Sequence, residues 1–220
     1  MKKVFFLVNS LDEFTFEDHL RRHGVEFEVG TALPPEDHAF AMVVLWSYRK
    51  IIPDISRIRN TVVFHSSDLP AGKGWAPIFN TITRKLDYYT ITGILASDSV
   101  DAGDVVVKAR FKMNVSYTAT ILRRWDDEIC AILIKEMVAK FGGNRLVGKP
   151  QPGSENFYAR RRPEQNEIDT TRPFSDAVDL LRACEVSHPA FFVYEGHRFQ
   201  VTLKPETEPV FPGDLEIVWS

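Results

Sequence analysis

The sequence predicts an α/β fold in which helices flank a mostly parallel sheet and a small helix and β-hairpin extend the C-terminal end. Two observations predict this fold. A strand, a helix and a second strand follow one another at the N-terminal end, which is how a parallel sheet begins. A continuous apolar run from Phe40 to Trp46 then suits a central strand that is buried on both faces.

The first part of the chain supplies most of the predicted parallel strands. Val4 to Val8 is apolar and Val25 to Val29 alternates, so both are interpreted as strands. Between them, Leu11 to His23 is a predicted helix that ends before Gly24. After the central strand, Thr61 to Phe64 is a fourth strand.

The middle of the chain predicts two helices and two further strands. Trp75 to Lys85 is a predicted helix with Pro77 in its first turn, where proline is tolerated. Tyr88 to Ala96 and Asp104 to Met113 are rich in strand-forming residues. Tyr117 to Phe141 is the longest predicted helix, because its apolar residues recur at spacings of three and four and form one stripe.

From Gly142, where two glycines end the long helix, the composition shifts toward Gly, Pro, Asn and Arg. We interpret the stretch that runs to Pro163 as a linker or extended excursion. The elements predicted after it are a helix from Ser175 to Cys184 capped by Ser175, a hairpin around Glu195 to Arg198, and a strand from Leu215 to Trp219. We expect residues 1–145 to form the main domain and residues 146–220 an extension packed on it.

Composition and charge favour a globular protein with small, specific partners. The 220 residues can bury a sizeable core, and the net charge of -3 and pI of about 6.1 give no basic field for nucleic acid or a membrane surface. No apolar run approaches the roughly 20 residues that cross a bilayer. The run from Val4 to Val8 is too short for a signal peptide, and Asp12 and Glu13 follow it. Cys130 and Cys184 have no metal-ligand spacing, which favours a reduced, cytoplasmic setting.

The candidate site begins at His65, which ends the fourth strand and opens a loop that glycine and proline keep irregular as far as Pro77. Proteins of the α/β class place their chemistry at such strand ends. By itself, His65 is as often a structural residue, and Asp101, in a turn before Gly103, is more often a turn former. The acidic run Asp126-Asp127-Glu128 is interpreted as a solvated face of the long helix.

Together these residues resemble a known signature. His65-x-Ser67-x-Leu69-Pro70-x-x-Lys73-Gly74-x-x-Pro77, followed by Asp101-x-Gly103-Asp104, is similar to the motif of the formyltransferases that use 10-formyltetrahydrofolate. Asp101 follows His65 by 36 residues, the spacing of the methionyl-tRNA branch. Ser47 to Pro53 is similar to the family's Tyr-x-x-Ile-Leu-Pro segment. Three segments in order are a stronger signal than any one motif.

The likeness is strongest to a short branch that formylates amino groups on nucleotide-activated sugars and is related to the formylation domains of peptide synthetases. Its motif His-x-Ser-Asp-Leu-Pro-x-Gly-Lys-Gly-Trp-x-Pro matches His65 to Pro77 throughout, and the likeness covers most of residues 40 to 204. The resemblance implies a truncated Rossmann-like sheet. It also implies an enzyme of surface glycan biosynthesis that moves a formyl group from 10-formyltetrahydrofolate to a sugar amine.

The resemblance implies roles for individual residues. His65 would shuttle the amine proton or stabilise the oxyanion, and Asp101 would orient the imidazole or accept that proton. The pterin ring would lie against two segments that contain Tyr48, Ile51, Ile52, Pro53, Ser97, Asp98, Val100 and Asp101. Further candidates for substrate binding are Trp75, Arg160, Arg161 and Arg182, since guanidinium groups match phosphate oxygens. A solvated charge run is the alternative for the arginines at 160–162.

The main departure from the family is Val63, which stands where the family has an asparagine that helps to hold the formyl oxygen. The loss of one such donor typically costs roughly 100- to 1000-fold in rate. Either the enzyme is slow or another donor substitutes, and the candidates are a backbone N–H, Ser66, Ser67, Lys73 and Asn80.

Several alternatives stay open. The acceptor could be water, a peptide-bound amine or a tRNA-bound amino acid, the last disfavoured by the acidic pI and the short chain. Because of Val63, a folate- or sugar-nucleotide-binding module without turnover is a further alternative. We expect small-molecule partners only, a folate and a sugar nucleotide, with no nucleic acid, membrane or metal, and a monomer or homodimer.

Overall fold

The computed structural model describes residues 2–55 and 58–220. Its centre is a seven-stranded sheet with the strand order β11-β7-β6-β4-β3-β1-β2. The strands of this sheet are β1 (Val4–Leu7), β2 (Phe27–Gly30), β3 (Met42–Leu45), β4 (Thr61–His65), β6 (Tyr88–Leu95), β7 (Val105–Lys112) and β11 (Glu216–Trp219). The ends of each strand lie within two residues of the range that the sequence predicts.

Five of the seven strands run in the same direction, so the predicted Rossmann-like, mostly parallel sheet is confirmed. β2, β1, β3 and β4 pair in parallel. β6 runs antiparallel to β4, β7 antiparallel to β6, and β11 antiparallel to β7 at the edge. The change from parallel to antiparallel pairing therefore occurs at β4.

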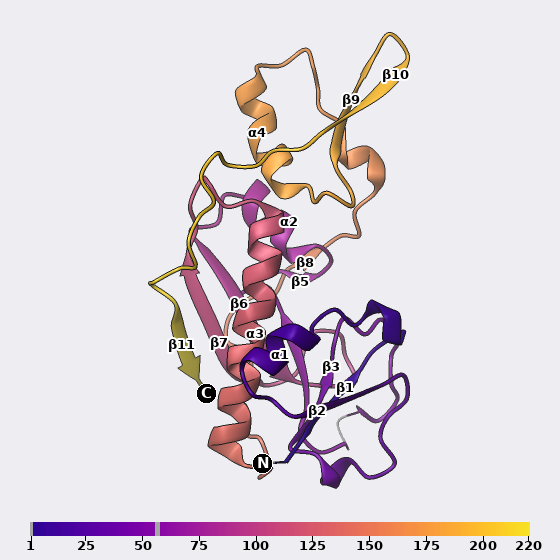
Figure 1. The fold of residues 1–220 in the computed structure, drawn as a ribbon, viewed down its shortest axis with the longest axis vertical. Helices are drawn as coiled ribbons and strands as arrows, with labels where there is room; N and C mark the ends of the chain where they lie inside the picture. Colours follow the sequence, from indigo (N-terminus) through magenta and orange to yellow (C-terminus); the bar gives the residue numbers. More distant parts are fainter. Residues whose placement is uncertain (1, 56–57) are drawn as a thin grey trace.

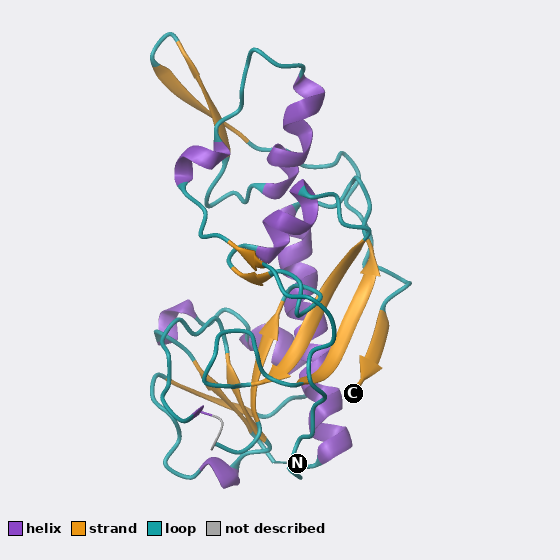
Figure 2. Cartoon of the chain, turned by 180° about the vertical axis from the view of Figure 1, so that it is seen from behind, coloured by secondary structure: helices purple, strands orange, loops and turns teal. Residues whose placement is uncertain are grey.

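Helices flank this sheet, as the sequence predicts. They are α1 (Glu17–Arg22), α2 (Pro77–Thr83) and α3 (Ala119–Phe141). A fourth helix, α4 (Phe174–Ala183), packs on α2, and short 3-10 turns lie at η1 (Leu11–Glu13), η2 (Asp37–Ala39) and η4 (Pro163–Asn166). Figure 1 shows α3 lying along the sheet with α1 beside it, and Figure 2 shows the molecule from behind. Within the described residues, no helix is both long and apolar enough to cross a membrane.

The long helix α3 matches its prediction closely. It begins after Thr118, whose hydroxyl accepts the N–H of Ile121 at 3.4 Å, and ends at Gly142, which has a left-handed φ of 56°. Its apolar stripe is buried in the main core, which also contains residues of β1, β3, β6 and β7. This burial is what holds the helix on the sheet.

The predicted helix from Leu11 to His23 is wrong in its first half. A link outside the helices, which contains Phe14 and Phe16, separates η1 from α1. Both rings pack on Phe6 of β1, with centroids 5.3 and 5.8 Å away. Residues two apart on an α-helix point in nearly opposite directions, so both rings reach Phe6 only because the chain is not helical here.

Two other helices begin at positions that the sequence did not predict. α2 begins at Pro77 rather than Trp75, because Ala76 has a left-handed backbone with φ 50°. α4 begins at Phe174, so Ser175 lies inside the helix and the prediction that it is the cap is wrong. The cap is Pro173, whose carbonyl accepts the N–H of Asp176 at 2.9 Å.

The stretch after Gly142 contains a strand that the linker prediction did not include. β8 (Phe157–Tyr158) pairs in parallel with β5 (Lys73–Gly74), in the loop after His65. Further on, β9 (Ala190–Tyr194) and β10 (His197–Val201) form the predicted hairpin, with a two-residue turn whose φ angles are 48° and 79°. Figure 1 shows α4 and this hairpin at one end of the molecule and β11 beside β7. The division at residue 145 stays a prediction.

Asn60 joins the start of β4 to the segment after α3. Its amide donates to the carbonyls of Ala41 and Asn144 at 2.9 and 2.8 Å, and its Oδ1 accepts the N–H of Leu146 at 2.8 Å. The residue is 7% exposed, so water cannot replace these bonds. Asn60→Leu is expected to lower the free energy of unfolding by about 3 kcal/mol in urea denaturation.

Asn144→Ala is the matched control for Asn60→Leu. The backbone carbonyl of Asn144 remains in this variant, and its side chain is exposed. We expect a change below about 0.5 kcal/mol. Equal losses in the two variants would show that the Asn60 side chain does not tie these segments together.

Candidate functional site

His65 is the last residue of β4, where the pairing changes from parallel to antiparallel. Its Nε2 donates to the carbonyl of Gly72 at 2.8 Å, so the loop that follows the strand folds back onto the ring. A carbonyl only accepts, which assigns the proton of the neutral ring to Nε2. The side chain is 10% exposed.

Asp101 reaches His65 by a fold of the β6–β7 connection. β6 runs antiparallel to β4, with Leu95 opposite Val62, so the chain leaves β6 near the start of β4 and turns back. The Asp101 carboxylate then lies with Oδ1 3.6 Å from His65 Nδ1, and its Oδ2 accepts the N–H of Gly74 at 3.0 Å. Sequence reasoning paired His65 with Asp101, and the structure brings the two together.

The pair can take up one proton from a ligand. When His65 is neutral, its Nε2–H is held by Gly72 and the lone pair of Nδ1 faces the Asp101 carboxylate. A proton that enters this gap can be bound by either group, and binding at Nδ1 gives an imidazolium beside a carboxylate. Because the Asp101 side chain is only 11% exposed, little water competes for that proton.

Two glycines allow the close approaches in this site. Gly74 has φ 92°, and a Cβ there would lie 2.7 Å from the carbonyl oxygen of Tyr158. A Cβ on Gly103 would lie 1.6 Å from the carbonyl oxygen of Leu95, so only glycine lets the turn after Asp101 press against the end of β6. These contacts give a physical reason for both glycines of the motif.

Asn156 and Gln151 hold the site together, and sequence reasoning did not select them as site residues. Asn156 Oδ1 accepts the N–H of Gly72 at 2.6 Å, which fixes the carbonyl that binds His65. Gln151 Nε2 donates to the carbonyls of Asp101 and Gly103 at 2.8 and 2.9 Å. Both lie in the stretch interpreted as a linker, and no local pattern there indicates contacts across 84 and 50 residues.

Most of the groups suggested as oxyanion donors already have partners. Ser66 Oγ donates to Asp126 at 2.8 Å, and Lys73 Nζ donates to Glu155 at 2.6 Å. The Asn80 amide donates to the carbonyls of Trp75 and Ala76, at the start of its own helix. Ser67 differs, because its buried hydroxyl has no hydrogen-bond partner within the part of the chain that the structure describes.

Val63 lies in an apolar cluster rather than among polar groups. It packs with the buried side chains of Leu69, Ile94 and Val105, and it pairs with Ile94 across the sheet. The side chains of residues 63 and 65 share one face of β4. The position next to His65 on this face therefore carries no side-chain donor.

The two segments assigned to the pterin ring both leave strands of the sheet. Tyr48 and Ile52 pack on a buried cluster of Phe5, Leu7 and Val43, while Ile51 is 76% exposed. Pro53 follows in the same loop. In the β6–β7 connection, which also holds Asp98, the Ser97 hydroxyl donates to the carbonyl of Ser99 at 2.9 Å and Val100 is 62% exposed.

Three of the four substrate candidates gather at the start of α2. The Arg160 guanidinium lies 5.0 Å from the ring of Trp75, which is 49% exposed, and that of Arg161 lies 3.2 Å from the ring of Phe79. Arg182 is different. It is 8% exposed, and its guanidinium donates to the carbonyls of residues 114 and 117 and to Asp179, so the structure does not present it to a ligand.

No protein-family model matches this sequence. Solved structures do match. The chain is similar to a methionyl-tRNA formyltransferase from Clostridium thermocellum, with a TM-score of 0.71 and 20% identity over 100% of both chains. It is similar to a sugar N-formyltransferase from a Shewanella species, with a TM-score of 0.69 and 16% identity over 95% of this chain and 100% of that one.

A third similar structure is HypX from Aquifex aeolicus in complex with tetrahydrofolic acid. Its TM-score is 0.74 at 17% identity, over 91% of this chain and 37% of that one. The chain has the formyltransferase fold. This agrees with the resemblance of the His65 and Asp101 motifs to the formyltransferase signature.

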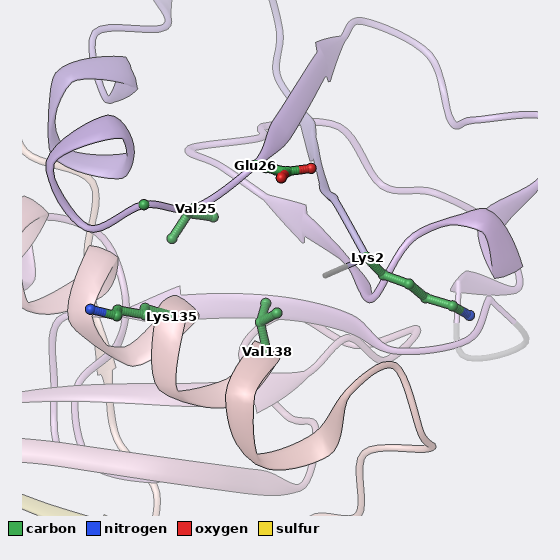
Figure 3. Close-up of a pocket in the computed structure, with 6 residues that line it drawn as sticks. Lys2, Val25, Glu26, Lys135 and Val138 are labelled. Carbon is green, nitrogen blue, oxygen red and sulfur yellow. The ribbon is translucent and has the colours of Figure 1, made fainter.

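Figure 3 shows a pocket away from His65 that has little room for a ligand. This cavity of about 10 Å³ lies between the segment before β2, with Val25 and Glu26, and α3, with Lys135 and Val138. It can hold about one water molecule. Within residues 2–55 and 58–220, no three His, Cys, Asp or Glu side chains are grouped as metal ligands.

The prediction that Asp126, Asp127 and Glu128 form a solvated face is wrong. Asp126 is 7% exposed. Burial and the charge of Asp126 raise the pKa of Asp127 to about 6. Burial alone would raise the pKa of Glu128, but hydrogen bonds from His23 and His19 outweigh it and lower that pKa. Glu128 contacts His19 and His23 near α1, whereas Asp126 faces Ser66 and Tyr89, and a single sequence does not reveal which elements cover these side chains.

Asp127→Asn is expected to stabilise the protein at neutral pH. A carboxyl whose pKa is raised from 3.8 to about 6 on folding makes stability fall as pH rises through that window. The variant should therefore gain about 1 to 2 kcal/mol at pH 7.5, roughly 4 °C in Tm, and almost nothing at pH 3.5. Thermal unfolding at the two pH values measures this.

Glu128→Gln is the control for Asp127→Asn, with the opposite sign. The lowered pKa of Glu128 means that it contributes stability above its unfolded pKa near 4.5, and that this contribution is lost as pH falls. We expect Glu128→Gln to lower Tm at pH 7.5. A gain from Asp127→Asn that is equal at both pH values would contradict the assigned cause.

Proposed function

We propose that this protein is an N-formyltransferase that moves the formyl group of 10-formyltetrahydrofolate to the amine of a nucleotide-activated amino sugar. The pair of His65 and Asp101 carries the proposal. A buried imidazole whose second nitrogen lies 3.6 Å from a carboxylate is suited to take a proton from an attacking amine. Its place at the end of a strand, in a formyltransferase fold, supports formyl transfer as the reaction.

In the proposed reaction, the pair of side chains moves one proton. The acceptor amine attacks the formyl carbon, so a new C–N bond forms and the carbonyl oxygen becomes an oxyanion. His65 Nδ1 and Asp101 accept the proton that the amine must lose. The bond from the same carbon to nitrogen 10 of the folate then breaks, and the pair returns the proton to that nitrogen.

We further propose that protonated His65 stabilises the oxyanion in the absence of the family asparagine. The engagement of Ser66, Lys73 and Asn80 with other groups supports this assignment. The backbone N–H groups of residues 72–75 are also hydrogen-bonded. The Nδ1–H of the imidazolium is then a charged donor beside Asp101, and the Ser67 hydroxyl is a second candidate.

The folate is proposed to bind against the Tyr48–Pro53 and Ser97–Asp101 segments. Exposed aliphatic side chains support this, because a flat heteroaromatic ring binds well on apolar surface, and both Ile51 and Val100 are more than half exposed. The likeness to the HypX structure that contains tetrahydrofolic acid is a second support.

The acceptor is proposed to bind near the start of α2. Arg160 and Arg161 can pair with a diphosphate, and the exposed ring of Trp75 offers a stacking surface for a base or sugar. The likeness to the Shewanella sugar N-formyltransferase supports a sugar amine as the acceptor.

A mass-spectrometric assay tests this function. The purified protein is incubated with 10-formyltetrahydrofolate and a panel of nucleotide-linked amino sugars, and we expect one sugar nucleotide to gain the mass of CO while tetrahydrofolate appears. A gain on methionyl-tRNA or a peptide amine instead, or formate released by water, would replace the proposed acceptor. Binding of the folate without any transfer would refute the enzymatic proposal.

A further inference from the structure

A buried carboxylate lies directly behind the catalytic strand end. Asp126 Oδ1 accepts a hydrogen bond from Ser66 Oγ at 2.8 Å and another from the Tyr89 hydroxyl at 2.6 Å. Asp126 belongs to α3, Tyr89 to β6, and Ser66 follows β4. One oxygen atom therefore links three elements of the fold.

Packing alone does not explain why a carboxylate is buried at position 126. Burial raises the pKa of the Asp126 carboxyl, against the opposing effects of the hydrogen bond from Tyr89, the charge of Arg123 and the hydrogen bond from Ser66. Apolar residues of similar volume often stabilise a core as well as a buried polar network does. By contrast, a buried network in which every polar group is hydrogen-bonded holds its side chains in one arrangement.

The arrangement that this network holds is that of residues 65–67. The His65 ring is fixed by the Gly72 carbonyl, and the carbonyl of Ser67 accepts the hydroxyl of Thr92 at 2.6 Å. Ser66, between them, is fixed by Asp126. The chain turns at Ser66, where the N–H of Ser67 donates to the carbonyl of His65 at 2.9 Å, and Ser66 reaches α3 while the His65 ring turns toward Asp101.

We propose that Asp126 is a positioning residue that holds Ser66 and thereby aims the His65 imidazole at Asp101. This role rests on the proposed function, and it assigns Ser66 to the support of His65 rather than to the oxyanion. Asp126 contacts neither of the reacting groups. Its charge also acts on His65, and the part of its effect that passes through Ser66 is the part that a double-mutant cycle isolates.

Kinetics of Ser66→Ala, Asp126→Ala and the double variant test the proposal. Each single change is expected to lower kcat about 10-fold, because a misplaced catalytic group loses rate steeply, and to leave KM for both substrates within about 2-fold. The double variant should lose no more than Asp126→Ala alone. Losses that multiply, or a Ser66→Ala variant with wild-type kcat, would overturn the proposal.

Tyr89→Phe separates positioning from general loosening of the core. It removes the other hydrogen bond to the same oxygen and leaves the one from Ser66 to Asp126 in place. We expect Tyr89→Phe to lower Tm and to leave kcat within about 2-fold of wild type. A drop in kcat as large as that of Ser66→Ala would mean that any damage to this core slows the reaction.

An NMR measurement keeps the inference testable even if no formyl transfer is found. The ring nitrogens of His65, identified by their absence in a His65→Gln sample, report the ring's position directly. Ser66→Ala and Asp126→Ala should shift these resonances, and Tyr89→Phe should not. Unchanged resonances in Ser66→Ala and Asp126→Ala would overturn the positioning role. If the resonances shift in these variants but the wild-type protein transfers no formyl group, only the proposed function is overturned.

Discussion

Replacing His65 with alanine is expected to lower kcat for formyl transfer at least about 1000-fold, because the imidazole is proposed both to move the amine proton and to hold the oxyanion. KM for the folate should change little, since His65 is outside the two segments proposed to bind it. Steady-state kinetics with 10-formyltetrahydrofolate and the acceptor found in the mass-spectrometric assay measure both constants.

Two variants serve as controls for His65→Ala. His65→Gln keeps an N–H that can reach the Gly72 carbonyl, so it should be equally inactive while unfolding near the wild-type temperature. His197→Ala removes an exposed histidine of the β9–β10 hairpin and should retain full activity. If either alanine or glutamine at position 65 leaves more than about a tenth of wild-type kcat, the role assigned to His65 is wrong.

Asp101→Asn is expected to lower kcat about 100- to 10,000-fold with little change in the fold. The amide oxygen can still accept the N–H of Gly74, so the loop remains in place. The amide group cannot accept the amine proton, and it cannot balance the charge of an imidazolium at 3.6 Å. Kinetics and thermal unfolding of the same sample separate the two effects.

Asp101→Ala is informative beside Asp101→Asn. Alanine leaves the N–H of Gly74 without its partner, so we expect an added loss of stability of about 1 to 2 kcal/mol. The exposed Asp87, in the turn before β6, offers an aspartate-to-asparagine control that should keep wild-type kinetics. An Asp101→Asn variant within about 3-fold of wild-type kcat would remove Asp101 from the mechanism.

Local patterns predicted most of the elements because burial follows periodicity. The apolar stripe on Tyr117–Phe141 and the apolar run at Phe40–Trp46 each indicate a surface that is buried in the core. The same reasoning did not detect the break at Phe14 and Phe16, where two rings share one partner. It also placed Asp126 in solvent, because charge in a single sequence does not reveal which element covers it.

The sequence by itself determined the order of the strands along the chain, the long helix, and the position of His65 at a strand end, since each depends on neighbouring residues. Tertiary structure alone decided which atoms surround that histidine. Gly72 meets Asn156 across 84 residues, and Ser66 meets Asp126 across 60. Hydrogen bonds of this kind form only after the sheet and α3 have packed, because direction and distance, rather than composition, decide whether two polar groups pair.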